Sequence, residues 1–211
     1  MGDKLLVEMP EPDNDEAGLV RRALDGDLEA FNGLVDRHQR AVYNLCLRML
    51  GSPAAAEDAA QEAFLSAFRA IRTFRGAVFR PWMMRIAANA CTDELRRRQR
   101  RPAMSLNAPA PGSEEPPEVA DTTPGPEAEA LRGEQGALIE SALLRLPNDQ
   151  RLAVILCDMQ GYAYEEIAVV MRCSVGTVKS RISRGREKLR RELQPLLREQ
   201  SGAGERQGVK T

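Results

Sequence analysis

The sequence has little of what metal sites and nucleophilic catalysis require. Its 211 residues include one histidine, His38, and four cysteines that lie far apart without a C-x-x-C pair. A single histidine argues against His-rich metal sites and Ser-His-Asp catalysis, and the cysteine spacing argues against zinc modules and disulfide scaffolds. We therefore expect no cofactor, no metal ion and no enzymatic activity. Reduced cysteines suit a cytoplasmic protein.

Long apolar runs are also missing. No stretch approaches the roughly 18–20 apolar residues that cross a bilayer. The apolar start at 5–7 is short and is interrupted by Glu8, so we expect no secretory signal and no membrane insertion. Hydrophobic residues make up 43% and charged residues 29% of the chain, an ordinary globular composition whose length allows one or two domains.

The formal net charge of -1 hides separate acidic and basic blocks. Residues 1–18 hold six carboxylates against one lysine, and residues 102–134 hold seven against one arginine. Residues 172–191 hold eight basic side chains against one glutamate, and residues 96–101 hold five arginines. One basic block could be a solvated helix face, but two blocks, each ending a helical unit, favour a polyanionic partner.

A proline-rich segment separates two helical units. Residues 102–134 contain seven prolines and few large apolar side chains, which predicts a flexible linker. Such a chain typically spans about 30 Å, and about 100 Å when extended, so the units could lie far apart on one partner. We predict an acidic tail over 1–16, helical domains over 17–101 and 135–195, and a C-terminal tail over 196–211.

The first unit, 17–101, is predicted to be a small helical bundle. Its apolar residues recur at three- and four-residue spacing, and no stretch alternates as a strand would. Gly51 ends one helix, Ser52 can cap the next, and Pro53 suits its first turn. A loop over 73–80 leads into a third helix. Short connections between helices are typical of antiparallel bundles.

The second unit, 135–195, is predicted to contain a helix-turn-helix. Asn148 can cap one of its helices, and Gly161 marks a turn. A short helix then leads through the tight turn 172–173 into a long basic helix that Ser174 can cap. Two short helices joined in this way are typical of DNA readers, whose second helix enters the major groove. Response-regulator output domains share this pattern.

Two sets of motifs resemble bacterial sigma factors of the extracytoplasmic-function (ECF) group. The resemblance to region four of that group lies in 164–168 (YEEIA) and 173–181 (CSVGTVKSR). The resemblance to region two lies in 56–64 (AEDAAQEAF), 74–76 (FRG), 79–82 (FRPW), 85–89 (RIAAN) and 93–97 (DELRR). The resemblance covers roughly 17–101 and 135–195, in the family order. It implies an all-α fold of two small helical domains, a region 2 bundle and a region 4 helix-turn-helix, joined by a flexible linker.

The resemblance implies a subunit that binds core RNA polymerase and directs promoter-specific initiation. It further implies that one acidic and polar helix face docks on the clamp helices of the polymerase. This face is formed by Glu57, Asp58, Gln61, Glu62 and Phe64. An acidic face suits a basic partner and mainly raises the association rate and specificity. The spacing alone would also fit a solvated helix face. An anti-sigma factor is a further expected partner.

The first unit is expected to recognise the -10 element of promoter DNA as an unpaired strand and so to promote strand opening. Aromatic rings beside arginines suit this task, because stacking contributes about 1–3 kcal/mol per base. The alternative for any one aromatic is a place in the core, and the arginine run could complement a helix dipole. The residues assigned here are Phe74, Arg75, Phe79, Arg80, Trp82, Arg85, Asn89, Arg96 and Arg97.

The second unit is expected to read the -35 element as duplex. The residues assigned are Ser174, Thr177, Lys179, Ser180 and Arg181, with Arg184 and Arg186 on the DNA backbone. The turn residue Arg172 stands where this pattern usually has glycine. A positive φ there would cost about 1 kcal/mol. The loop between Gly76 and Phe79 is about one residue shorter than the family pattern.

Two other classes of protein would fit part of these observations. A stand-alone helix-turn-helix regulator would bind duplex DNA tightly without polymerase and would not need the first unit. A helical scaffold or signalling module would show no dependence on DNA. The remaining chemistry-bearing residues have an ordinary explanation, since Cys46 and Cys91 fall on inward helical faces and His38 lies at the edge of the core.

Overall fold

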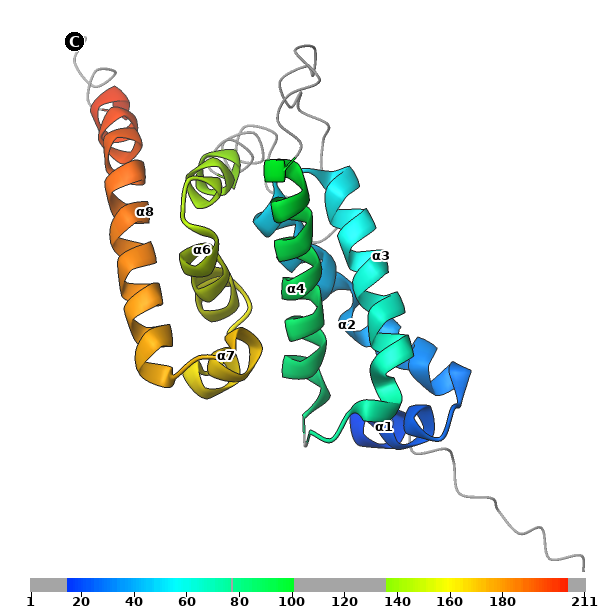
Figure 1. Cartoon of the computed structure of the whole chain (residues 1–211). Coiled ribbons are helices and arrows are strands. Elements are labelled where there is room, and N and C mark those ends of the chain that lie inside the picture. The colour runs from blue at the N-terminus through cyan, green and yellow to red at the C-terminus, as the bar shows by residue number, and fades with distance from the viewer. Residues whose placement is uncertain (1–14, 77, 101–135, 205–211) are drawn as a thin grey trace, which may run out of the picture.

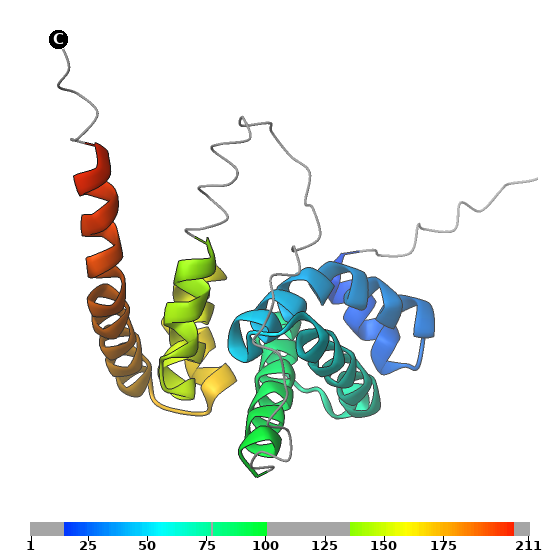
Figure 2. The same cartoon turned by 90° about the horizontal axis from the view of Figure 1, so that it is seen from above.

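The computed structural model describes residues 15–76, 78–100 and 136–204. Every regular element within these ranges is helical, which confirms the all-α fold (Figures 1 and 2). The predicted linker 102–134, nearly all of the predicted tail 1–16, and Arg101 lie outside the described residues.

The first half is a helical bundle whose turns use the capping residues that the sequence offers. It consists of α1 (Glu16–Leu24), α2 (Leu28–Leu50), α3 (Pro53–Ala70), the 3₁₀ turn η1 (Ile71–Thr73) and α4 (Phe79–Arg100). The carboxylate of Asp27 accepts a hydrogen bond from Ala30 N at 3.1 Å at the start of α2. Gly51 ends α2 at φ 68°, and Ser52 Oγ accepts from Ala55 N at 3.5 Å. The predicted boundary between these two helices is confirmed.

The second half consists of a helix over 136–144, α6 (Asn148–Val154), the π-helical turn η2 (Ile155–Met159), α7 (Tyr164–Met171) and α8 (Val175–Gly204). The predicted cap at Asn148 is wrong by one position, because Pro147 is the N-cap of α6 and its carbonyl accepts from Arg151 N at 2.9 Å. The predicted cap at Ser174 is confirmed, since its Oγ accepts from Thr177 N at 3.1 Å. Helix α8 continues past residue 195.

The turn between α7 and α8 places a non-glycine residue in the left-handed region. Arg172 has φ 50° and ψ 50°, and it is the one non-glycine residue with positive φ in the described part of the chain. An L-residue in this conformation costs roughly 1–2 kcal/mol. The positive φ considered for this position from the sequence is therefore present, together with its cost. Cys173 N closes the turn on Ala168 O at 3.1 Å.

One hydrophobic core runs through both halves. Helices α4 and α7 lie side by side (Figure 1), and their buried side chains belong to the same cluster, for example Met83 and Met84 with Ile167. Helix α3 packs closely against α2 and α4 because its buried face consists of small residues: Ala56, Ala59, Ala60, Ala63 and Ala67. The two predicted domains are thus in contact, although the linker is long enough to let them separate.

Polar side chains of the second half also bind backbone carbonyls of the first. The guanidinium of Arg151, only 5% exposed, donates to Met49 O at 2.6 Å and to Leu146 O at 3.1 Å. Burial lowers the pKa of Arg151. Gln160 Nε2 donates to Ala41 O at 2.9 Å. The bonds to Met49 O and Ala41 O join residues about a hundred positions apart in sequence and fix the halves against each other, whereas the bond to Leu146 O lies within the second half.

Candidate polymerase and nucleic-acid interfaces

The acidic face predicted on α3 is present at the surface. Glu57, Asp58, Gln61 and Glu62 are all exposed. Glu62 Oε1 accepts from Ser66 Oγ at 3.1 Å and lies 3.5 Å from Arg69 Nη1, both exposed contacts. The fifth predicted residue of this face, Phe64, is instead half-buried and packs against the core. The structure therefore brings the four polar residues together at the surface and partly buries Phe64 beside them.

Two apolar residues continue this face and were missed in the sequence. Leu65 is 44% exposed and Phe68 is 47% exposed, and the Phe68 ring meets Phe31 edge-on at 5.0 Å between centroids. Both follow Asp58 and Gln61 at helical spacing, so a helical-wheel projection would have placed them on the same side. An acidic surface with adjoining apolar side chains is typical of a protein-protein contact.

The predicted aromatic cluster forms, but most of it is internal. Phe74 is 5% exposed and Phe79 is 2% exposed, while Trp82 is half-buried. Ring centroids lie 5.2 Å apart for Phe74 and Trp82 and 5.4 Å apart for Phe79 and Trp82. The backbone at Gly76 runs so close to the Phe74 ring that a Cβ would meet it at 2.8 Å. In this arrangement the two phenylalanines support Trp82.

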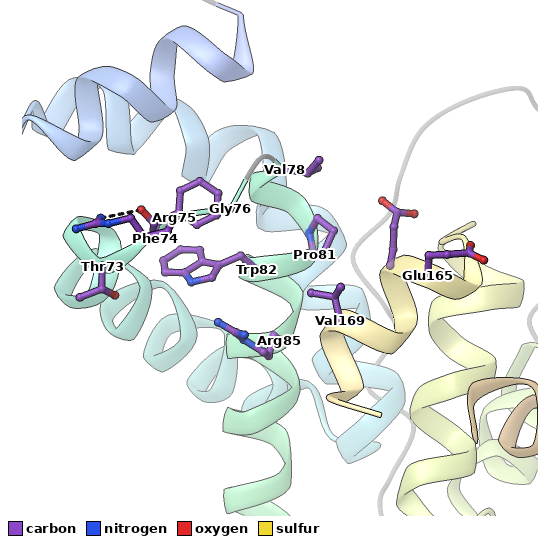
Figure 3. A pocket seen from close by; sticks show the side chains of 11 residues that line it. Thr73, Phe74, Arg75, Gly76, Val78, Pro81, Trp82, Arg85, Glu165 and Val169 are labelled. Atoms are coloured by element: carbon purple, nitrogen blue, oxygen red, sulfur yellow. Dashed lines mark hydrogen bonds between the residues drawn. The ribbon is translucent and has the colours of Figure 1, made fainter. Parts of the chain in front are cut away.

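A cavity of about 560 Å³ lies beside Trp82, between the two halves. Trp82 and Arg85 of α4 line it from the first half, and Glu165 and Val169 of α7 line it from the second (Figure 3). Arg75, also on the rim, turns its guanidinium back to donate to the carbonyls of residues 72 and 74, at 2.7 and 3.0 Å. The cavity combines an aromatic ring, guanidinium groups and, opposite them, carboxylates.

Arg80 is part of the joint between the halves. Its Nη2 donates to Gln160 O at 2.7 Å, and its guanidinium carbon lies 3.9 Å above the Tyr162 ring. Burial raises the pKa of Tyr162 to about 12, so this ring is neutral and stacks as a cation–π partner. In this structure Arg80 is thus occupied by the second half.

The arginines at the end of α4 are paired with their own helix. Arg96 lies 3.5 Å from Asp93, and Arg97 Nε donates to Glu94 at 2.7 Å. The hydrogen bond from Arg97 holds the pKa of Glu94 below its ordinary value. Asn89, one turn or more away, is exposed. These pairings between residues three apart on the helix leave the arginines at the surface with part of their charge already neutralised.

The helix-turn-helix presents part of its predicted residues to solvent. Ser174, Lys179, Ser180 and Arg184 are exposed, and Thr177 is half-buried. Ser180 Oγ donates to Thr177 O at 2.9 Å. Among the described residues Lys179 and Arg184 make no hydrogen bond or ion pair, so their charges are available to a ligand.

The other two predicted arginines of α8 are engaged inside the second half. Arg181 Nε donates to Asp149 of α6 at 2.9 Å, and its Nη1 lies 3.5 Å from Cys173 Sγ. Arg186 Nε donates to Asp158 of η2 at 3.0 Å, with a second hydrogen bond from Nη2. The bond from Arg186 lowers the pKa of Asp158. Sequence separation of about thirty residues hid these pairs.

The histidine and two of the four cysteines, Cys46 and Cys91, are internal groups. His38 is buried, with Nε2 at 3.2 Å from a Glu16 carboxylate oxygen, and burial lowers its pKa. The neighbouring thiol of Cys46 and burial together raise the pKa of Cys91. Across residues 15–76, 78–100 and 136–204, no three or more His, Cys, Asp or Glu side chains gather as metal ligands would. No described helix is both long and apolar enough for a membrane span.

Comparisons with known proteins assign the two halves to two named regions. Residues 34–101 match the family description Sigma-70 region 2, and residues 137–189 match Sigma-70, region 4. The chain is 42% identical over 184 residues to the RNA polymerase sigma-H factor of Pseudomonas aeruginosa, with 86% of this chain and 95% of the relative covered. The protein belongs to the ECF group of the sigma-70 family. The two motif sets thus led to the correct family.

This ECF factor has further relatives in sequence and structure. It is 40% identical over 182 residues to the ECF RNA polymerase sigma-E factor of Escherichia coli K12, covering 85% of this chain and 95% of that protein. It is similar to CnrH in complex with the cytosolic domain of CnrY, at TM-score 0.64 and 26% identity over 87% of this chain and 99% of that chain. The sigma factor RpoE of Bartonella quintana, solved with the anti-sigma factor NepR, shares the fold at TM-score 0.62, 24% identity and coverage of 79% and 98%.

Proposed function

We propose that this ECF factor binds core RNA polymerase and directs promoter-specific initiation, recognising -10 and -35 elements and promoting strand opening. The observation that carries the proposal is the ordered pair of region 2 and region 4 in one chain. Relatives at 40% identity and above are named RNA polymerase sigma factors. The protein acts as an initiation factor rather than as an enzyme, in the cytoplasm where core polymerase works.

The exposed face of α3 is the proposed polymerase contact. Four polar or acidic side chains and two exposed apolar ones share it. Carboxylates there would steer the factor toward a basic surface, and Leu65 with Phe68 would supply apolar area once docked. This assignment rests on Glu57, Asp58, Gln61 and Glu62 as polar contacts, with Phe64 supporting the face from the core.

The proposed site for the unpaired -10 strand is centred on Trp82. Its half-buried ring offers a stacking surface, Arg85 and Arg75 offer positive charge, and Asn89 offers an amide to a base edge. Phe74 and Phe79 hold the ring in place. Arg80, Arg96 and Arg97 would reach phosphates after exchanging their present partners. Flipping a base costs a few kcal/mol, which stacking returns, so no nucleotide hydrolysis is required.

The proposed -35 reader is the exposed side of α8. Lys179 and Arg184 have no charged partner within the described ranges, and Ser174, Thr177 and Ser180 carry hydroxyl groups near the helix start. A recognition helix meets base edges with its N-terminal residues and phosphates with its basic ones.

Promoter recognition requires the halves to separate. The two DNA elements lie roughly one and a half helical turns, about 50 Å, apart, whereas α4 and α7 are in contact in this structure. Glu165 and Val169 also line the cavity beside Trp82, so an unpaired strand and α7 compete for the same space. We therefore assign this structure to the factor before it engages DNA.

An anti-sigma factor is the proposed third partner. Two structural relatives were solved with a bound protein, CnrY for CnrH and the anti-sigma factor NepR for RpoE. Such a partner would stabilise the state in which the two halves are in contact.

Run-off transcription tests the proposal. Core polymerase is incubated with genomic fragments, with and without this factor, and transcripts are mapped. We expect new promoter-specific start sites that depend on the factor. A stand-alone regulator would instead bind duplex tightly with no effect on core polymerase, and a scaffold would show neither effect; either result would contradict the proposal.

A further inference from the structure

Helix α8 packs on α6 along a narrow apolar seam. Val178, Ile182 and Gly185 lie at i, i+4 and i+7, and the first two are at most 2% exposed. At Gly185 the helices approach so closely that a Cβ would meet Val154 Cγ2 at 2.7 Å and Gln150 O at 3.3 Å. Helix α8 also packs against α7, and polar pairs on the flanks of the seam add directional contacts that oppose rotation of α8 about its own axis.

Two ion pairs flank this seam from opposite sides. At 100° per residue, Arg181 lies roughly 60° to one side of the seam and Arg186 roughly 80° to the other. Arg181 binds Asp149 on α6 at 2.9 Å, and Arg186 binds Asp158 on η2 at 3.0 Å. Each guanidinium also lies near a thiol, Cys173 at 3.5 Å for Arg181 and Cys157 at 3.6 Å for Arg186. Rotation of α8 in either direction would lengthen one of the two pairs.

From this geometry we propose that Arg181 and Arg186 are positioning residues that set the rotation of the recognition helix, rather than DNA contacts. The proposal rests on the -35 reading function proposed above. Side chains end about 5–6 Å from a helix axis, so a rotation of about 20° moves them about 2 Å. That displacement takes a donor outside hydrogen-bonding range of a base edge. Lys179, Ser180 and Arg184 depend on this rotation.

Charge balance supports the assignment. A guanidinium hydrogen-bonded to a carboxylate forms a neutral pair, which attracts phosphates weakly. Side-chain exposure is 27% for Arg181 and 49% for Arg186, below the 68% and 59% of the paired Arg96 and Arg97, whereas Arg184 is exposed and unpaired among the described residues. Each phosphate that a protein neutralises lowers the slope of log K against log salt by about 0.9. The two kinds of arginine should therefore differ in their salt dependence.

The first test is the salt slope of the full chain on a random-sequence duplex. The double variant Asp149→Asn, Arg181→Gln removes the pair without changing net charge, and we expect its slope to equal that of the parent. Arg184→Gln is the matched control and should lose about 0.9. A loss of about 0.9 in the double variant would make Arg181 a phosphate contact and overturn the proposal. This test needs no promoter, so it remains decisive if the proposed transcription function fails.

The second test is sequence discrimination by the factor bound to core polymerase. The probe is a promoter found by run-off transcription, compared with the same fragment carrying a scrambled -35 element. We expect the neutral double variant to lower the preference roughly two- to fivefold, the effect of losing one partly exposed ion pair.

The swapped variant Asp149→Arg, Arg181→Asp restores the pair and should restore the preference. A merely structural role would lower thermal stability with discrimination unchanged, and a base contact would not be rescued by the swap; either outcome overturns the proposal. Asp158→Arg with Arg186→Asp repeats the test on the other flank.

Discussion

The two halves of this ECF factor differ in how freely their proposed DNA-binding residues meet solvent. In the first half, Phe74 and Phe79 are buried, Arg80 is held by Gln160 and Tyr162, and Trp82 lines a cavity that α7 also lines. In the second half, the charges of α8 that carry no internal partner point outward. Under the proposed function, this difference means that the free factor is ready to bind duplex DNA but not an unpaired strand. The proposed strand recognition then depends on separation of the halves.

The largest effect on this difference between the halves is expected from removing the buried hydrogen bonds of Arg151. Arg151→Ala deletes hydrogen bonds to Met49 O, Leu144 O and Leu146 O and leaves carbonyls unpaired. We expect the free energy of unfolding to fall by about 2–4 kcal/mol, measured by urea denaturation. Arg145→Ala is the control, since its ion pair with Glu192 is exposed and contributes less than about 1 kcal/mol. Equal stability of the two variants would mean that the joint does not hold the halves.

Next in size is the loss of the stacking ring. Trp82→Ala in the polymerase-bound factor should weaken binding of an unpaired -10 strand by about 1–3 kcal/mol, whereas binding of a -35 duplex should not change. Trp82→Phe retains an aromatic face and should retain most of the affinity. Fluorescence anisotropy with labelled strand and duplex measures both. An equal loss on both probes would show that the residue stabilises the fold rather than the strand.

Charge reversal on α3 tests a surface that belongs to neither proposed DNA site, so it should change polymerase binding without reducing DNA binding. Asp58→Lys with Glu62→Lys should weaken binding to core polymerase by about tenfold, mainly through slower association. Duplex binding by the full chain should not fall. The control is Glu29→Lys with Asp36→Lys, which makes the same charge change at exposed positions of α2. Unchanged polymerase affinity would remove Asp58 and Glu62 from the docking face.

A smaller effect is expected in the strained turn of the second half. Arg172→Gly relieves the left-handed backbone at φ 50° and should raise the free energy of unfolding by up to about 1 kcal/mol. Arg40→Gly, in the middle of α2 and exposed, should lower it by about 1 kcal/mol. Thermal and urea unfolding of both variants give the comparison. Destabilisation by Arg172→Gly would indicate that the arginine side chain outweighs the strain.

The smallest expected effect is a pH dependence that belongs to the first half alone. Burial holds the pKa of His38 below 6.5, against the opposing charge of Glu16, with Arg80 and Arg37 also lowering it. The unfolded chain therefore binds a proton first, so the free energy of unfolding should fall as pH drops below about 6.5. No other histidine is present in the chain, and His38→Gln should be flat between pH 7.5 and 5.5. A matching slope in that variant would assign the proton uptake elsewhere.

Local signals predicted the helices well. The boundary at Gly51, Ser52 and Pro53 and the left-handed turn at Arg172 depend only on neighbouring residues, so their conformations follow from the chain itself. The predicted N-cap of α6, Asn148, was wrong by one residue. The preceding residue, Pro147, is the N-cap because its carbonyl accepts the first hydrogen bond of the helix, from Arg151 N. Such one-residue ambiguities are inherent in adjacent capping candidates.

Long-range pairing could not be predicted in the same way. The sequence gives no sign that Arg181 meets Asp149 or that Arg80 stacks on Tyr162, because the partners belong to different helices. Amphipathic periodicity likewise identifies the inward face of a helix but not which neighbour covers it. For this reason the sequence predicted neither the burial of Phe74 and Phe79 nor the exposure of Leu65 and Phe68 on α3. The assignment of Phe64, Phe74 and Phe79 to interfaces stays a prediction.

The shared core between halves of a single polypeptide has a kinetic consequence. Two separate proteins with this interface would meet at a rate set by their dilution, whereas two halves of one chain meet at a local concentration that does not depend on dilution. After release from polymerase the factor should return to its compact form by a first-order process. The number of factor molecules in the cell then affects how often promoters are used. It does not affect the rate at which each released molecule returns to the compact form.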